Sequence, residues 1–116
     1  MREKHVSDNL RVVRTVVAGD PWAALADPTR RAVLARVAER PQSVEDIASA
    51  FPVSRPAVSQ HLRVLAEAKL VVGERNGRCR IYRANADGFR EPRAELERFW
   101  SQALLNFKRI AEEEDE

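Results

Sequence analysis

The stretch that most constrains the fold is FPVS, residues 51–54, which separates two segments of helical period. Each segment carries apolar residues on a single helical face: Val44, Ile47, Ala48 and Phe51 before the break, and Val58, Leu62 and Leu65 after it. Pro52 pushes the residue before it out of the helical region, so the segments form two helices and not one. Two helices joined by so short a turn predict a helix-turn-helix unit.

Residues that cap helices stand where these and two earlier helices begin. Asp20 and Asp27 each precede a proline, which is favoured in the first turn because its missing N–H costs nothing there. Ser43 has Asp46 three residues later, as in a capping box, and Ser54 precedes the second helix of the unit. The helix after Asp27 reads PTRRAVLARVAER, with an inward face made of Val33, Leu34 and Val37.

After residue 70 the pattern changes to a short β-hairpin, LVVGERNGRCRIYR. Its central Asn76-Gly77 favours a two-residue type I′ turn, with positive φ at both positions. With that turn the partners across the hairpin are Arg75 and Arg78, Gly73 and Arg80, and Val71 and Tyr82. Alternation then predicts a basic face of Arg75, Arg78 and Arg80, opposite a face of Val72, Cys79 and Ile81.

The charge of the chain is unevenly spread. The formal net charge is +2, yet residues 54–83 hold seven basic side chains against Glu67 and Glu74, a local charge of +5. The last five residues, EEEDE, are all acidic. A local basic surface suits a polyanion such as nucleic acid, although a merely solvated charged face has the same composition.

The two ends of the chain are candidates for subunit contact. Residues 6–17 have helical spacing but are rich in β-branched side chains, so they are helical or mobile. From about Pro92 a long helix repeats apolar residues at a mean spacing of 3.5, which is typical of helix pairing. A chain of 116 residues also gains core by dimerising. The predicted dimer-interface residues are Leu10, Val13, Val17, Leu96, Phe99, Trp100, Ala103, Leu104, Phe107 and Ile110.

From Trp22 to Tyr82 the chain resembles the ArsR/SmtB family of bacterial winged-helix repressors, through ALADPTRRAVL and SRPAVSQHLRVLAEAKLV. The resemblance implies a homodimer on operator DNA, with SRPAVSQHLRVL as recognition helix and ERNGRCR as wing. Gln60 and Arg63 also suit adenine and guanine edges by their own chemistry, and Arg55 suits a phosphate. The predicted DNA-binding residues are Ser54, Arg55, Pro56, Ser59, Gln60, His61, Arg63, Arg75, Arg78 and Arg80.

The chain departs from the metal-sensing members of that family. SVEDIASAFP has no cysteine and PRAELERFWSQALLNFKRI has no histidine, where those members carry metal ligands. His5 and His61 are far apart in sequence, and a transition-metal site needs three or four convergent ligands. We therefore predict no metal and no other cofactor, and read His61 as a partly buried residue that braces its helix or donates to a phosphate.

Other chemistry finds little support. Cys79 is the only cysteine, so an intrachain disulfide is excluded, and the residue is a simple strand position or a thiol made oxidisable by Arg78 and Arg80. There is no glycine-rich phosphate loop and no nucleophile–base motif, so we predict no enzyme. The aromatic residues suit a core or interface, or an apolar effector pocket between the terminal helices: Trp22, Phe99, Trp100 and Phe107.

We predict one mainly α domain with a small β-hairpin, a winged helix-turn-helix that dimerises through its N- and C-terminal helices. Its parts are an N-terminal segment, a core, a dimerisation helix and a disordered acidic tail: residues 1–19, 20–87, 88–111 and 112–116. The predicted function is a cytoplasmic repressor on an inverted-repeat DNA operator, with no membrane segment and an unknown effector. The alternatives are a winged-helix module for an acidic protein partner, and a thiol- or metal-responsive sensor of this fold.

Overall fold

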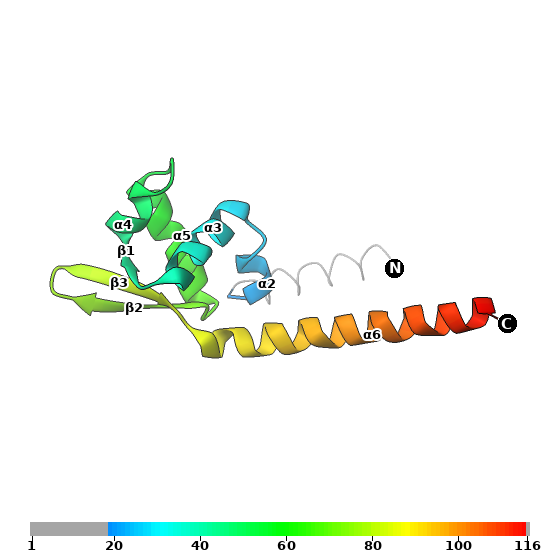
Figure 1. The fold of residues 1–116 in the computed structure, drawn as a ribbon. Helices are drawn as coiled ribbons and strands as arrows, with labels where there is room; N and C mark the ends of the chain where they lie inside the picture. Colours follow the sequence, from blue (N-terminus) through cyan, green and yellow to red (C-terminus); the bar gives the residue numbers. More distant parts are fainter. Residues whose placement is uncertain (1–18, 116) are drawn as a thin grey trace, which may run out of the picture.

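Short helices and a small sheet form the body of the protein, from which one long helix extends (Figure 1). The computed structural model describes residues 19–115, so the predicted contacts of Leu10, Val13 and Val17 lie outside the described residues. The helices of the body are α2 (Pro21–Ala24), α3 (Pro28–Glu39), α4 (Val44–Ser49) and α5 (Arg55–Glu67). The remaining elements are β1 (Gln42–Ser43), β2 (Val71–Asn76), β3 (Cys79–Ala84), η1 (Ala86–Phe89) and α6 (Arg90–Asp115).

Side-chain caps begin the four body helices where the sequence predicts them. An oxygen of Asp20, Asp27, Ser43 or Ser54 accepts the backbone N–H three residues further along, at 3.0 to 3.2 Å. Each bond satisfies one of the N–H groups that a helix leaves free at its start. The capping side chains of Ser43 and Ser54 therefore define where α4 and α5 begin, and the second of them sets the residue at which the turn between the helices ends.

The core lies where α3 and α4 pack on α5 and on the start of β2. The predicted inward residues of α3 and α5 are buried, at no more than 8% exposed: Val33, Leu34, Val37, Val58, Leu62 and Leu65. Ile47 of α4 is fully buried among them, together with Leu70 and Val71 after α5. Since this face of α5 is used by the core, its opposite face is left to solvent.

The end of α5 is tied to the chain that leads into α6. Lys69 has a φ of 64°, and the N–H groups of Lys69 and Leu70 donate to the carbonyls of Ala66 (3.0 Å) and Leu65 (2.9 Å). These are the two bonds of a Schellman motif, here with lysine where glycine is usual. Asn85 donates its side-chain N–H to the carbonyl of Lys69 at 2.9 Å, which holds the end of β3 against the end of α5.

The register predicted for the hairpin is wrong. Arg75 pairs with Arg80 and Asn76 with Cys79, so the two-residue loop is Gly77-Arg78. Gly77 has a φ of 64° and Arg78 is not among the positive-φ residues, which fits a type II′ turn with glycine first. The shift is two residues along β3, and side chains alternate with a period of two, so Arg75 and Arg80 still share a face. Arg78 lies in the turn and not on that face.

A third strand, which the hairpin pattern does not predict, completes the sheet. β1 pairs antiparallel with β3, giving the strand order β1-β3-β2. Gln42 of β1 is only 3% exposed, and its amide donates to the carbonyls of Arg36 (2.6 Å) and Arg40 (3.3 Å). The amide oxygen accepts from the Arg36 guanidinium at 3.2 Å, so this buried side chain is satisfied. β1 thereby anchors the hairpin beside α4.

α6 projects from the body as a single helix of 26 residues (Figure 1). It is tied to α2 by Trp22, whose indole N–H donates to Glu95 at 3.2 Å. The helix continues to Asp115, so the expected disorder of the acidic residues from 112 onward is wrong for those described. Glutamate is a good helix former, and adding residues to an existing helix needs no new nucleus. Among the described residues, no helix is long and apolar enough to cross a membrane.

Candidate nucleic-acid interface

The outer face of α5 presents polar side chains to solvent. Ser59, Gln60 and Arg63 are exposed, whereas Val58 and Leu62 of the same helix are fully buried. Ser54 and Pro56, at the start of the helix, are exposed as well. No salt bridge or side-chain hydrogen bond within the described part of the chain involves Gln60 or Arg63. Both are therefore available to the hydrogen-bonding edges of another molecule.

At the start of α5, Arg55 already has a partner. Its guanidinium donates to the carboxylate of Glu45 in α4 at 2.8 Å, and about two thirds of each side chain is exposed, 65% and 68%. The two residues are ten positions apart and meet only because the helix-turn-helix folds α4 back against α5. Sequence spacing gave no signal for this pair, so Glu45 was not among the predicted site residues.

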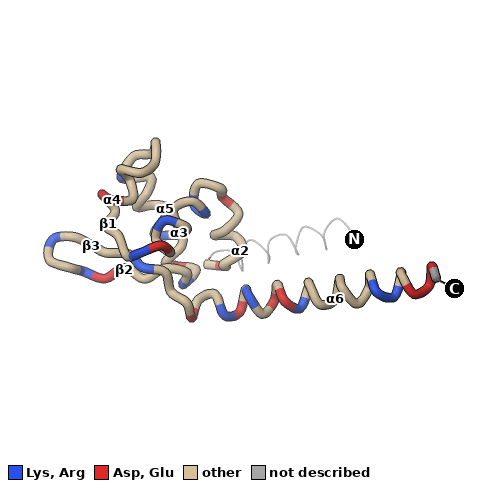
Figure 2. The backbone as a smooth tube through the Cα atoms, viewed as in Figure 1, with Lys and Arg blue, Asp and Glu red and all other residues tan. Residues whose placement is uncertain are grey.

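The β2–β3 hairpin places two arginines directly opposite each other. Arg75 and Arg80 are cross-strand partners on one face, both are exposed, and neither forms a salt bridge with any residue the structure describes. Like charges at opposed positions destabilise a sheet by their repulsion. By contrast, Arg83 on the other face is neutralised by Glu74, with bonds of 3.0 and 3.2 Å. Figure 2 shows basic residues near the turn end of this hairpin.

A groove brings the start of α5 and the hairpin together. We call it the basic groove, and its volume is about 210 Å³. It is lined by Ser43, Val44, Glu45, Arg55, Arg78, Cys79 and Arg80. Three of the predicted DNA-binding arginines thus meet in one place, from two elements far apart in sequence. Cys79 is exposed beside them as a free thiol.

His61 lies at the edge of the buried face of α5. It is half-buried, and its Nδ1 is buried without a hydrogen-bond partner among the described residues. Asp27, the cap of α3, has its pKa lowered first by the backbone N–H of Arg30, and to a smaller degree by His61. His61 is half-buried whereas Gln60 and Arg63 are exposed, so it is less accessible than either of them. A contact of His61 with DNA stays a prediction.

The described residues of the predicted dimer interface form one apolar face of α6. Six of its seven side chains are between 42% and 64% exposed in the single chain: Leu96, Phe99, Trp100, Leu104, Phe107 and Ile110. Ala103, the seventh, is half-buried. Monomeric proteins rarely expose so many large apolar side chains on one contiguous face.

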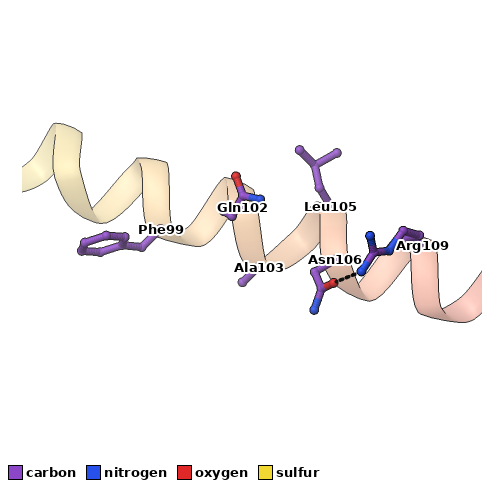
Figure 3. Close-up of a pocket in the computed structure, with 6 residues that line it drawn as sticks. All are labelled: Phe99, Gln102, Ala103, Leu105, Asn106 and Arg109. Carbon is purple, nitrogen blue, oxygen red and sulfur yellow. Dashed lines mark hydrogen bonds between the residues drawn. The ribbon is translucent and has the colours of Figure 1, made fainter.

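The opposite side of α6 differs from this face. Figure 3 shows Leu105 pointing away from the side on which Ala103 and Asn106 lie. Figure 3 draws the residues that line a hollow of about 500 Å³, which include Phe99 and Ala103 of the apolar face as well as Leu105. All of them belong to α6, so the hollow is open along one side of the helix. Trp22, which the sequence suggested for an apolar effector pocket, does not line this hollow. Its indole N–H donates to Glu95 instead.

The described part of the chain holds no group of three or more His, Cys, Asp or Glu side chains placed to bind a metal ion. His61 is the one histidine in that part, and His5 lies outside it.

Comparison with known proteins identifies the architecture. A helix-turn-helix domain family matches residues 25–74, the segment that contains α3, α4 and α5. HTH-type transcriptional regulator Rv2034 of Mycobacterium tuberculosis is 45% identical over 93 residues, which cover 80% of this chain and 87% of that protein. The chain belongs to the ArsR/SmtB family of helix-turn-helix transcriptional regulators.

Further relatives agree with this assignment to the ArsR/SmtB family. The structure of an ArsR-like transcriptional regulator from Rhodococcus sp. RHA1 has a TM-score of 0.66 and 33% identity, and the match covers 85% of this chain and 95% of that one. HTH-type transcriptional repressor SmtB of Mycobacterium tuberculosis is 42% identical over 66 residues, 57% of this chain and 49% of that protein. The fold and relatives are those of DNA-binding transcriptional regulators and not of enzymes.

Proposed function

We propose that the protein is a homodimeric repressor that binds an inverted-repeat DNA operator in the cytoplasm. In this proposal each subunit places α5 in a major groove, where Gln60 and Arg63 read base edges. Arg75, Arg78 and Arg80 of the hairpin and Arg55 of α5 bind backbone phosphates, which set the register of the protein on the duplex.

The observation that carries this proposal is the pair Arg75 and Arg80, which no acidic side chain of residues 19–115 neutralises. The two guanidinium groups repel each other in the free protein, while the neighbouring Arg83 has a carboxylate partner. A phosphate beside the hairpin relieves that repulsion, and DNA supplies phosphates at regular spacing. The basic groove brings the first residue of α5, Arg55, beside Arg78 and Arg80 of the hairpin.

The apolar face of α6 supports the homodimer. A helix with Phe99, Trp100 and Phe107 more than 60% exposed is stable in water only when another surface covers that face. A second copy of α6 offers a surface of the same chemistry and repeat. A dimer also gives two copies of α5, which is what an inverted repeat requires.

The test is selection of bound sequences from a pool of random double-stranded DNA, followed by titration of the best sequence and a scrambled one at several salt concentrations. The proposal predicts an inverted repeat with half-sites about 34 Å apart, one turn of DNA. It also predicts that affinity for both duplexes falls steeply with salt. A pool that returns no enriched sequence contradicts the operator.

A basic surface also suits an acidic protein partner, which was the alternative of another class. Gln60 and Arg63 together favour DNA, because amide and guanidinium groups on one exposed helical face match adenine and guanine edges. Absence of binding to any duplex at low salt, where phosphate contacts are strongest, would favour the acidic protein partner.

A further inference from the structure

We propose that Glu45 is a built-in competitor of DNA phosphate: it holds Arg55 in the free protein and so lowers affinity for DNA of every sequence. This inference rests on the proposed DNA-binding function and adds a residue to its site. Glu45 acts on the general, electrostatic part of binding, which sequence-independent phosphate contacts supply. A regulator gains from such a device because nonspecific sites greatly outnumber its operator.

The geometry of the basic groove is the first support. Glu45 is the one acidic side chain among the seven residues that line it, and three of the others are arginines. Its carboxylate bonds to Arg55 at 2.8 Å, whereas Arg78 and Arg80 form no salt bridge within residues 19–115. The carboxylate therefore sits where an anion bound to this groove has to come.

The exposure of the pair is the second support. The side chains of Glu45 and Arg55 are 68% and 65% exposed, so water screens their attraction. Such a pair exchanges easily for another anion, and a DNA phosphate presents two charged oxygens that the same guanidinium can bind in the bidentate way. When DNA binds, Arg55 either gives up its salt bridge to Glu45 or keeps that salt bridge while it contacts a phosphate. In both cases the contact between Arg55 and the phosphate adds less binding free energy than the same contact made by an unpaired arginine.

Glu45 also has a local reason to be where it is. It lies in the first turn of α4, where an acidic side chain is favoured by the helix dipole. That role alone predicts a small loss of thermal stability when the charge is removed and no change in DNA binding. Salt dependence of binding separates the two roles, because the dipole effect does not alter the number of phosphates engaged.

The experiment compares Glu45→Gln with Glu97→Gln on a selected operator duplex and on random DNA. Glu97 is the matched control: its side chain is also 68% exposed and paired with an arginine, Arg93, but it lies on α6. Both substitutions change the net charge equally. We expect Glu45→Gln to tighten binding to both duplexes by about 3- to 10-fold near 0.1 M salt. The slope of log K against log salt should steepen by up to about 0.9, and Glu97→Gln should change affinity less than about 2-fold.

A second background tests the route through Arg55. In an Arg55→Ala protein, Glu45→Gln should tighten binding by less than it does in the wild-type background, because there is no longer an Arg55 for Glu45 to hold and only its direct repulsion of phosphate is removed. Weaker operator binding by Glu45→Gln, or an equal gain in both backgrounds, overturns the proposal. If the wild-type protein binds no duplex at any salt concentration, the proposed DNA-binding function is wrong. If it binds DNA but Glu45→Gln leaves the slope of log K against log salt unchanged, only the proposed role of Glu45 is wrong. Thermal melting of each variant confirms that it is folded.

Discussion

Gly88 lies where the chain enters α6, and an alanine there should disrupt the junction between α5 and α6. A Cβ built on Gly88 lies 1.7 Å from the carbonyl oxygen of Lys69 and 2.6 Å from its carbonyl carbon. Both atoms are backbone, held by the Schellman motif at the end of α5 and by the Asn85 side chain. The obstacle cannot rotate away as a side chain can, so η1 has to move.

The size of the effect follows from that distance. Carbon and oxygen at van der Waals contact are more than 3 Å apart, so the junction must open by more than 1 Å. Overpacking of this kind costs about 1–3 kcal/mol, and a rigid backbone obstacle places Gly88→Ala at about 3 kcal/mol. For a domain near 100 residues each kcal/mol lowers Tm by about 4–8 °C, which gives a fall of about 12–24 °C.

The assay is thermal and urea unfolding at one fixed protomer concentration, because the proposed dimer adds stability that depends on that concentration. Gly73→Ala is the matched control, because its Cβ would meet the ring of Tyr82, at 2.8 Å from Cε1, and a side chain can shift. Gly73 and Gly88 both have φ outside the left-handed region, so the gain in unfolded-state entropy is shared. We expect Gly73→Ala to stay within about 1 kcal/mol of wild type. Equal Tm values for Gly73→Ala and Gly88→Ala would contradict the idea that a backbone obstacle costs more than a side chain that can shift.

Three further predictions concern binding and assembly. Arg63→Ala should lose about 1–3 kcal/mol of binding free energy on the selected operator and little on scrambled DNA, as measured by fluorescence anisotropy. Equal losses on both duplexes would show that Arg63 does not read a base. Arg78→Ala should weaken all duplexes alike and reduce the salt slope by about 0.9, so an unchanged slope on random DNA would contradict its phosphate contact. Phe107→Glu, which puts a charge on the apolar face of α6, should shift the protein toward monomer in sedimentation velocity, with Leu105→Glu on the opposite side as the control.

The helices of the body could be predicted closely because their signals are local. Asp27 and Ser54 each bond to a backbone N–H three residues away, and a cap of that kind depends on little else in the fold. The buried face of α5 follows in the same way from the 3.6-residue period of Val58, Leu62 and Leu65. Since that face is fixed, so is the exposed one, and with it the positions of Gln60 and Arg63.

The predicted hairpin register was wrong because Gly77 fits two different two-residue turns. Asn76-Gly77 satisfies a type I′ turn, and Gly77-Arg78 satisfies a type II′ turn with glycine at its first position. The turn residues alone do not decide between the two, and β3 is also paired along its other edge. There β1 pairs Gln42 with Tyr82 and Ser43 with Ile81, and a two-residue strand has no pattern of its own to read.

Contacts between side chains far apart in the chain could not be predicted from the sequence for a related reason. Glu45 and Arg55 are each ordinary first-turn residues of separate helices, and only the angle of the turn brings them together. Trp22 and Glu95, bonded at 3.2 Å, are 73 positions apart. Charge counts along the chain therefore give the excess of basic residues in 54–83 but not which arginines are already neutralised, as Arg55 and Arg83 are.

The length of α6 links the proposed dimer to the proposed operator. At 1.5 Å per residue, two copies paired antiparallel about Ala103 have their first residues, Arg90, about 39 Å apart. Each Arg90 follows η1, which lies against the end of α5, so this pairing puts the C-terminal ends of the two copies of α5 a comparable span apart. One turn of DNA is about 34 Å, whereas a parallel pairing brings both starts of α6 to the same end. The half-site spacing recovered by selection therefore reports how α6 pairs, and half-sites much closer than one turn would contradict the antiparallel arrangement.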